Sequence, residues 1–311
     1  MKRGSETERG LVLINALLVV AALSAVAVIL LQTAQSARNR QFYIQEVAQT
    51  QAYLDGFELL LRRQLDADRA RGDVDHLNEP WAQKGYTVPI DRGMAQGRIH
   101  DLQGRFNLNW LAGGDAVLGA DAFAVLIREL GLNSSLAEAI MAWVSETGPK
   151  NLTPYLAARP GIKPPGGQIT LLDELRLVSG VTPAIFAKLQ SVLTAVPAQS
   201  AININTAPRP VLQAAMPGVS ASVIGALIAL RKQEPFADGD AVDAYLQGIM
   251  SKEELDKFPA GVFVTSSRWF QAEISVRLGQ TRLARRLVFR RSGENAKTRV
   301  EYRFIPKEQA G

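Results

Sequence analysis

The 311-residue chain contains no cysteine and only two histidines, His76 and His100. Without cysteine it can form no disulfide, no thiol nucleophile and no cysteine-ligated zinc or iron–sulfur site. The two histidines lie in no HExxH motif, and the Walker A, GxGxxG and GxSxG spacings are absent. We therefore expect no catalytic residue, no bound cofactor and a function other than that of an enzyme.

Charge is missing altogether from Leu11 to Leu31, a run of 21 residues rich in leucine, valine and alanine. As a helix this run measures roughly 32 Å, which matches the hydrocarbon thickness of a bilayer. A buried core helix and a secretory signal cleaved at Ala25-Val26-Ala27 are the alternatives, although the run exceeds the usual signal core of about 7–15 residues. We predict a transmembrane segment over residues 11–31, with the N-terminus in the cytoplasm.

The junction in front of this segment carries a motif. The leader MKRGSETERG, residues 1–10, ends in Gly10, so its polar residues lie before the apolar run and the glycine adjoins that run. Arg9-Gly10 followed by Leu11 resembles the cleavage site of type IV prepilins and type II secretion pseudopilins. The resemblance implies cleavage after Gly10 by the prepilin peptidase, and then N-methylation of Leu11.

Asn15 occupies the fifth position after this cleavage site, where most members of that superfamily have glutamate. The family's glutamate resembles a counter-charge for the terminal amine of the neighbouring subunit inside the apolar filament core. Burying an amine without a carboxylate is costly, so a subunit with asparagine there is a poor repeating unit. Asn15 therefore marks a subunit of the filament tip, which has no neighbour above it.

The rest of the chain predicts an α+β fold. No proline occurs between Leu11 and Asn78, and apolar residues at three- and four-residue spacing extend one long helix over residues 11–65. Alternating residues predict a strand at 86–90, a turn at 91–93, a strand pair within 98–108 and a three-stranded antiparallel meander within 260–311. Residues 66–108 and 260–311 would form a pilin-like body, with an all-α domain of residues 109–259 inserted between them.

Three segments of this insert share a pattern that predicts turns between paired helices. They begin with Gly131, Gly180 and Gly218, and their N-cap residues are Asn133, Thr182 and Ser220. In each, the glycine can supply the positive-φ residue that ends the preceding helix. The pattern indicates a helix-hairpin-helix or SAM-like bundle rather than a regular solenoid.

Extended back to Ile204, the third segment also resembles the helix-hairpin-helix modules of DNA-uptake and repair proteins. Those modules bind phosphate through backbone N–H groups of a glycine-rich turn. Ser220 replaces the second turn glycine, and Arg209 and Arg231 are the only basic residues of the segment before Lys232. A membrane-anchored DNA-binding or uptake protein is thus the alternative function, while a structural or protein-contact role is favoured for the module.

Charged residues gather at two further places. Asp238, Asp240 and Asp243 are candidate metal ligands, although their order does not fit an EF-hand loop and helix capping is the alternative. From Arg282 to Arg303 there are eight basic and two acidic residues, a net charge of +6 against +5 for the whole chain. This basic segment suits an acidic partner or lipid headgroups, and a solvated sheet face explains it equally well.

Several motifs together resemble the minor pseudopilin K family of type II secretion systems, the GspK family. They are Gly10 before the apolar run, Asn15, GRFNLNWL from Gly104, Ala142-Trp143, LLDELRLVSGV from Leu171 and ININTAPRPVLQAAMPGVS from Ile202. The resemblance covers nearly the whole chain. It implies a single-pass protein of the bacterial inner membrane with a periplasmic domain, which caps the pseudopilus tip and helps to initiate its assembly for export of folded periplasmic proteins.

The resemblance also implies partners, and it predicts where a calcium site would lie. The partners would be the minor pseudopilins I and J, through them H and the major pseudopilin, the prepilin peptidase, the inner-membrane assembly platform, exoproteins and the secretin, with no nucleic acid. Some members of the family look like calcium binders that use an acidic segment after the Ala-Trp motif. Here Glu146 is the only acid of that stretch, so the family's ligand set does not carry over to this chain.

Overall fold

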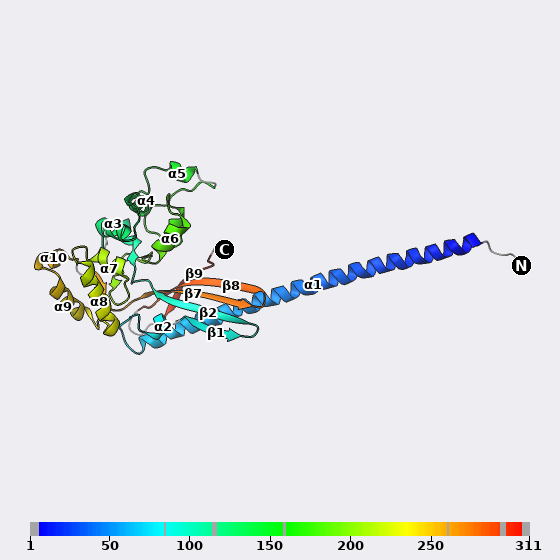
Figure 1. Ribbon diagram of the computed structural model, residues 1–311, viewed down its shortest axis with the longest axis horizontal. Coiled ribbons are helices and arrows are strands. Elements are labelled where there is room, and N and C mark those ends of the chain that lie inside the picture. Colours follow the sequence, from blue (N-terminus) through cyan, green and yellow to red (C-terminus); the bar gives the residue numbers. More distant parts are fainter. Residues whose placement is uncertain are drawn as a thin grey trace.

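A single helix forms the spine of the molecule. The computed structural model describes residues 6–83, 85–113, 117–157, 160–259, 261–292 and 297–306. Helix α1, Glu6–Arg69, is 64 residues long and projects far beyond the rest of the protein on its N-terminal side (Figure 1). It begins before Gly10 and ends near Gly72, well ahead of Pro80, the first proline after the apolar run.

A five-stranded antiparallel sheet covers one side of the C-terminal half of α1. Its strands are β1 (Tyr86–Ile90), β2 (Gly93–Asp101), β7 (Trp269–Leu278), β8 (Thr281–Arg290) and β9 (Arg299–Phe304), in the order β1-β2-β7-β8-β9. The chain leaves the sheet after β2 and returns at its neighbour β7, so everything between them is an insertion. The predicted α+β class and the C-terminal meander are confirmed, but the strand pair predicted within residues 98–108 is wrong, because that stretch completes β2 and then adds the two-residue strand β3 (Phe106–Asn107).

The core of this body forms where the apolar stripe of α1 meets one face of the sheet. Leu54, Phe57, Leu61 and Leu65 are buried against the alternating residues Phe270, Ala272, Ile274, Val276, Leu287 and Phe289. Trp81 from the short helix α2 (Pro80–Gln83) closes one end with an edge-on contact to Phe270. The period of two in β7 and β8 thus decides which face of the sheet α1 covers.

Strand β8 runs parallel to the axis of α1. At one end the Thr281 hydroxyl donates to Glu46 (2.8 Å), and just beyond the other end Arg291 contacts Asp68 (3.7 Å). Glu46 and Asp68 are separated by roughly 33 Å at 1.5 Å per helical residue. Thr281 and Arg291 are separated by about the same length at 3.4 Å per strand residue. The strands of the sheet therefore run along the axis of α1 (Figure 1).

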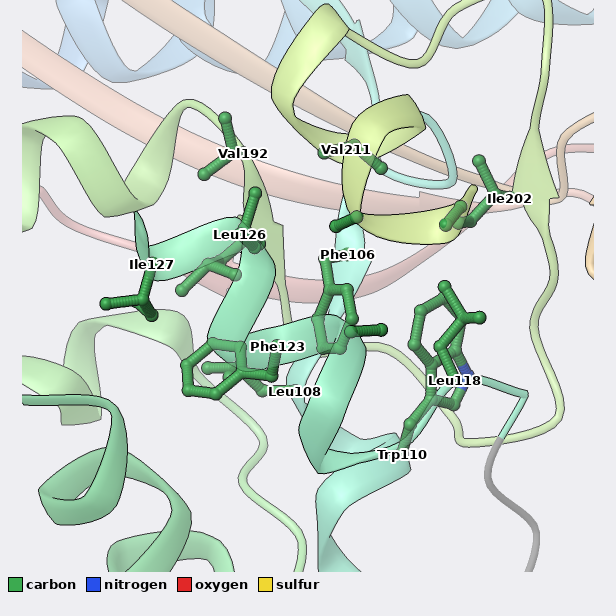
Figure 2. Packing of buried hydrophobic residues seen from close by; sticks show 14 of the residues in the cluster. Phe106, Leu108, Trp110, Leu118, Phe123, Leu126, Ile127, Val192, Ile202 and Val211 are labelled. Atoms are coloured by element: carbon green, nitrogen blue, oxygen red, sulfur yellow. The ribbon is translucent and has the colours of Figure 1, made fainter. Parts of the chain in front are cut away.

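The insert is a bundle of short helices with its own core at the end of the sheet farthest from the N-terminus (Figure 1). Its elements are η1 (Leu108–Ala112), α3 (Ala120–Glu129), α4 (Ser134–Val144), α5 (Thr153–Leu156), η2 (Leu172–Leu177), α6 (Pro183–Gln190), α7 (Arg209–Ala215), α8 (Ala221–Gln233), α9 (Gly239–Ile249) and α10 (Lys252–Lys257). Two short parallel pairs, β3 with β4 (Leu193–Thr194) and β5 (Ile202–Asn203) with β6 (Phe263–Val264), tie it together. Phe106, Trp110 and Phe123 lie at the centre of its core (Figure 2).

The three predicted turns form as capped helix starts. The side chains of Asn133, Thr182 and Ser220 accept from the backbone N–H groups of Ser135, Ile185 and Val223 and begin α4, α6 and α8. Gly131 (φ +66°) and Gly180 (φ +89°) take the predicted left-handed conformation. Gly218 does not, so that part of the prediction is wrong for the third turn.

Candidate functional site

The apolar half of α1 is not covered by any other described part of the chain. Every large apolar side chain between Leu11 and Leu31 is more than half exposed. The mean hydropathy reaches 2.8 over 18 residues of α1, and none of these residues is buried. A helix of this length and composition fits a membrane anchor. Asn15 lies within this bare segment, whereas residues 1–5 of the leader lie outside the described part of the chain. Cleavage after Gly10 and methylation of Leu11 stay predictions.

The helix continues from this segment into the folded body, where a buried acid holds it to the sheet. Glu58 of α1 accepts hydrogen bonds from Arg285 (2.8 Å) on β8 and from Arg303 (2.6 and 3.0 Å) on β9. Burial alone would raise the pKa of the Glu58 carboxyl, but the hydrogen bonds and charges of Arg303 and Arg285 outweigh it and hold that pKa below its usual range. Glu58 therefore connects α1 to two neighbouring strands of the sheet.

The predicted basic segment divides between the two faces of the sheet. Arg285, Arg291 and Arg303 point toward α1 and pair with its acids or with Asp75. Arg286 lies on the opposite face, where it pairs with Asp173 (2.8 Å) and Glu273 (3.3 Å). Half of the eight basic residues thus serve the fold itself.

The helix-hairpin-helix module, α7 and α8, uses its two arginines internally. The guanidinium of Arg231 is buried and donates to the backbone carbonyls of Ile204 and Ala207 (2.6 Å to Ala207). Arg209 donates to the carbonyl of Ala221 (2.9 Å) at the start of α8. The third basic residue of this segment, Lys232, is exposed, and its side chain makes no hydrogen bond to the described residues.

The turn of this module is occupied by a carboxylate. A Cβ atom placed on Gly218 would lie 2.5 Å from Oε1 of Glu254, which the N-terminus of α10 carries. Hydrogen bonds from the backbone and hydroxyl of Ser251 lower the pKa of Glu254, so this carboxylate is charged at neutral pH. A negative group at this turn opposes the approach of a phosphate.

The predicted metal ligands are placed on the surface and take no part in a cluster. Asp238 caps α9 through the backbone N–H of Ala241 (2.9 Å), and Asp240 and Asp243 are exposed on that helix. Within the described residues, the one group of three acids close enough to share a cation is Asp68, Asp75 and Glu79, whose carboxylate oxygens lie within 4.8 Å of one another. Neither the three aspartates of α9 nor Glu146 belongs to such a group.

Asp75 of this group and Asp101 lie in a buried junction between the body and the insert. Asp75 accepts from the backbone N–H of Ser267 (2.7 Å) and contacts Arg291, and Asp101 accepts from Ser267 Oγ (2.7 Å) and from Thr206 of the insert. Burial raises the pKa of Asp75 to about 7, and it raises the pKa of Asp101 as well. This junction could not be predicted from the sequence, because Asp75 and Arg291 are 216 residues apart and no local pattern links them.

The asparagines of the family motifs hold loops of the insert. Asn107 donates to the carbonyl of Val196 (3.0 Å), and Asn109 donates to those of Ile169 (3.0 Å) and Val196 (2.9 Å) and accepts from Ile169 N–H (2.9 Å). In the ININTAP segment, Asn203 donates to the carbonyl of Asp75 (3.0 Å) and Asn205 bonds both backbone groups of Phe236 (2.9 Å each). Each amide takes the place of a backbone partner in a buried loop, so these motifs specify shape.

Replacement of Asn109 by alanine should lower the free energy of unfolding by about 2–4 kcal/mol, because it leaves the buried backbone N–H and carbonyl of Ile169 without their side-chain partner. Urea unfolding followed by tryptophan fluorescence measures it. The matched control is Asn133→Ala, which removes an exposed helix cap and should cost about 1 kcal/mol. Equal losses of stability in the two variants would contradict this prediction, because the buried hydrogen bonds of Asn109 would then contribute no more than one exposed helix cap.

Comparison with known proteins gives the family. Two family models described as type II secretion system (T2SS), protein K match residues 104–198 and 202–260, which are the insert. The type II secretion system protein K of Pseudomonas aeruginosa is 29% identical over 322 aligned residues, which cover 96% of this chain and 92% of that protein. The type II secretion system protein K of Pectobacterium carotovorum is 24% identical over an alignment that covers 92% of this chain and 94% of that protein. The fold matches a chain of the GspK-GspI-GspJ complex of enterotoxigenic Escherichia coli, with a TM-score of 0.70, 22% identity and coverage of 86% of this chain and 99% of that one. The chain belongs to the type II secretion system protein K family.

Proposed function

We propose that the chain is a minor pseudopilin of a type II secretion system and acts by assembly rather than by chemistry. The observation that carries this proposal is α1, whose bare apolar half continues without a break into a half that is fixed to the sheet. Such a helix suits two environments in turn, a bilayer and the apolar core of a filament. The α1 segment would hold the protein in the inner membrane, with the N-terminus in the cytoplasm and the globular part in the periplasm.

The place we propose for this subunit is the pseudopilus tip. Asn15 provides no carboxylate for the terminal amine of a neighbour, so an identical subunit above it would bury that amine unpaired. The insert adds a second core at the end of the sheet away from the membrane helix (Figure 1). A bulky domain in that position is compatible with one subunit at the end of a filament and not with a closely packed repeat.

The partners we propose are minor pseudopilins I and J. The structure whose fold this chain shares is that of a GspK-GspI-GspJ complex, and the chain matches almost the whole length of one of its members. Through this tip complex the chain would meet pseudopilin H and the major pseudopilin. It would also meet the assembly platform, the secretin and exoproteins. The export of folded periplasmic proteins then depends on the chain as a structural component.

Loss of the chain from its host should therefore stop the release of folded exoproteins while leaving them active in the periplasm. Exoprotein activity in the culture medium and in the periplasmic fraction measures this. A gene copy that encodes the chain should restore release. Normal secretion in the deletion strain would contradict the proposed function.

A membrane-anchored DNA receptor is the alternative, and duplex DNA tests it. The arginines of the hairpin are engaged internally and Glu254 occupies its turn, so we expect no salt-dependent binding of duplex by the purified chain at low ionic strength. Fluorescence anisotropy of labelled duplex measures it, with Lys232→Gln as the matched variant. Tight binding that Lys232→Gln weakens would favour the DNA receptor.

A further inference from the structure

The face of the sheet opposite α1 is rich in arginine. Strand alternation places on it Gln96 and Arg98 of β2, Glu273, Ser275 and Arg277 of β7, Arg282, Ala284 and Arg286 of β8, and Tyr302 and Phe304 of β9. We call this set the outer face. Its polar side chains are exposed or half-buried, in contrast to the buried apolar residues that alternate with them and face α1.

A groove runs over the outer face. Its volume is about 560 Å³, and Gln96, Ser275 and Ala284 lie in line across three strands within it. These short or flexible side chains leave space between the longer Arg98 and Arg286. A second hollow of about 270 Å³ shares Glu273 and Arg286 with the groove and extends it under the insert to Arg105.

Among the described residues, three arginines of this face have no acidic partner. Arg277 and Arg282 stand directly opposite each other in the β7–β8 register, and like charges in that position repel. No ion pair joins Arg98, Arg277 or Arg282 to another of the described residues. Glu273, between Arg98 and Arg286 in the register, already pairs with Arg286 (3.3 Å). Anionic groups from another molecule would complement this face.

The orientation of the sheet decides which anionic partner fits. Because β8 runs parallel to α1, whose apolar half is the proposed membrane anchor, the outer face would extend away from the bilayer rather than lie on it. Lipid headgroups could reach only the end near Arg277 and Arg282. The face also carries the stacked pair Tyr302 and Phe304 (ring centroids 6.0 Å apart), and arginine together with aromatic residues is typical of protein interfaces.

We propose that the outer face docks a carboxylate-bearing polypeptide segment of another protein, with Arg98, Arg277 and Arg282 as its principal contacts. The segment lies along the groove between β1 and β8. Its acidic side chains separate the two opposed arginines and reach Arg98, while its other side chains contact Ala284 and the Tyr302–Phe304 pair. This docking goes beyond the assembly function and does not require the tip position.

The test uses the full-length chain in nanodiscs of zwitterionic lipid. The probe is a fluorescent peptide in which glutamate alternates with threonine, and the control probe has glutamine in place of glutamate. The variant Arg98→Gln/Arg277→Gln/Arg282→Gln is compared with Arg63→Gln/Arg128→Gln/Lys188→Gln, which removes the same charge from exposed sites away from the face. Melting curves of both variants verify that each is folded.

We expect the glutamate peptide to bind in a salt-sensitive way, the glutamine peptide not to bind, and the outer-face variant to weaken binding about tenfold or more. The control variant should bind as the parent does. Equal losses in the two variants, or equal binding of the two peptides, would overturn the proposal. Anionic vesicles or duplex DNA that bind through the same three arginines more tightly than the peptide would overturn it too, in favour of a lipid or nucleic-acid surface.

Discussion

Replacement of Arg291 by methionine should lower the free energy of unfolding by about 3–5 kcal/mol at pH 8, where it leaves buried, ionised carboxylates without their cation. Arg291 is buried and contacts both Asp75 and Asp68, which are themselves almost completely buried. Asp101 lies in the same junction, and the charge of Arg291 also lowers its pKa. Methionine keeps much of the volume of the side chain, so the loss reports mainly the charge.

The loss should depend on pH. Burial raises the pKa of Asp75 from 3.8 to about 7, and burial together with the charges of Glu79 and Asp75 raises the pKa of Asp68. A carboxyl whose pKa is higher in the folded state contributes stability that is complete below its unfolded pKa and is lost as pH rises through about 7. The parent protein should therefore be more stable at pH 5.5 than at pH 8. The deficit of Arg291→Met should grow over the same range.

Urea unfolding of the full chain at several pH values measures both effects, since all four tryptophans lie within the folded body and insert. Arg299→Met is the matched control, because Arg299 is exposed on the edge strand β9. It should change stability by less than about 0.5 kcal/mol at any pH. A deficit for Arg291→Met that is small, or that shrinks as pH rises, would contradict the charge balance assigned to this junction.

Replacement of Gly10 by valine should leave the leader attached and abolish secretion. The resemblance to prepilins places the cut after Gly10, where a β-branched residue would crowd the peptidase site. An uncut leader keeps Lys2, Arg3 and Arg9 at the end of the apolar run. Charges there prevent the helix from leaving the membrane for an apolar filament core. Mass spectrometry of the purified chain measures processing directly, because it shows whether the leader has been removed and whether the N-terminal residue is methylated.

Gly56→Val provides the control, because it makes the same change elsewhere in α1 at an exposed position with open space around it. That variant should be processed and methylated normally. Cleavage of the Gly10→Val chain at its usual site, or secretion at the parental level without cleavage, would contradict the pseudopilin assignment.

Elements with strong local patterns were predictable, and contacts between distant segments were not. The apolar run and the helical spacing beyond it define α1, and the alternation in 269–278 identifies the buried face of β7, because both periods are properties of neighbouring residues. The caps at Asn133, Thr182 and Ser220 follow from local hydrogen bonding in the same way.

The division of the basic segment could not be predicted, because it depends on which acids of α1 lie opposite each strand. Glu58 and Arg303 are 245 residues apart, and nothing near either one identifies the other. The same limit applies to Asp75 and Arg291. From the sequence alone, the basic strands could be either a partner surface or a solvated face. The structure assigns one set of arginines to the fold, and another set on the outer face has no ion pair with the described residues.

The most direct test of the assembly function is purification of the full-length chain from its host at native expression level, followed by identification of what remains bound. We predict that minor pseudopilins I and J are recovered with the processed chain in comparable amounts. We also predict that shortening α1 by removal of the apolar run disrupts this recovery. Isolation of the chain alone, or with nucleic acid in place of the two pseudopilins, would contradict the account.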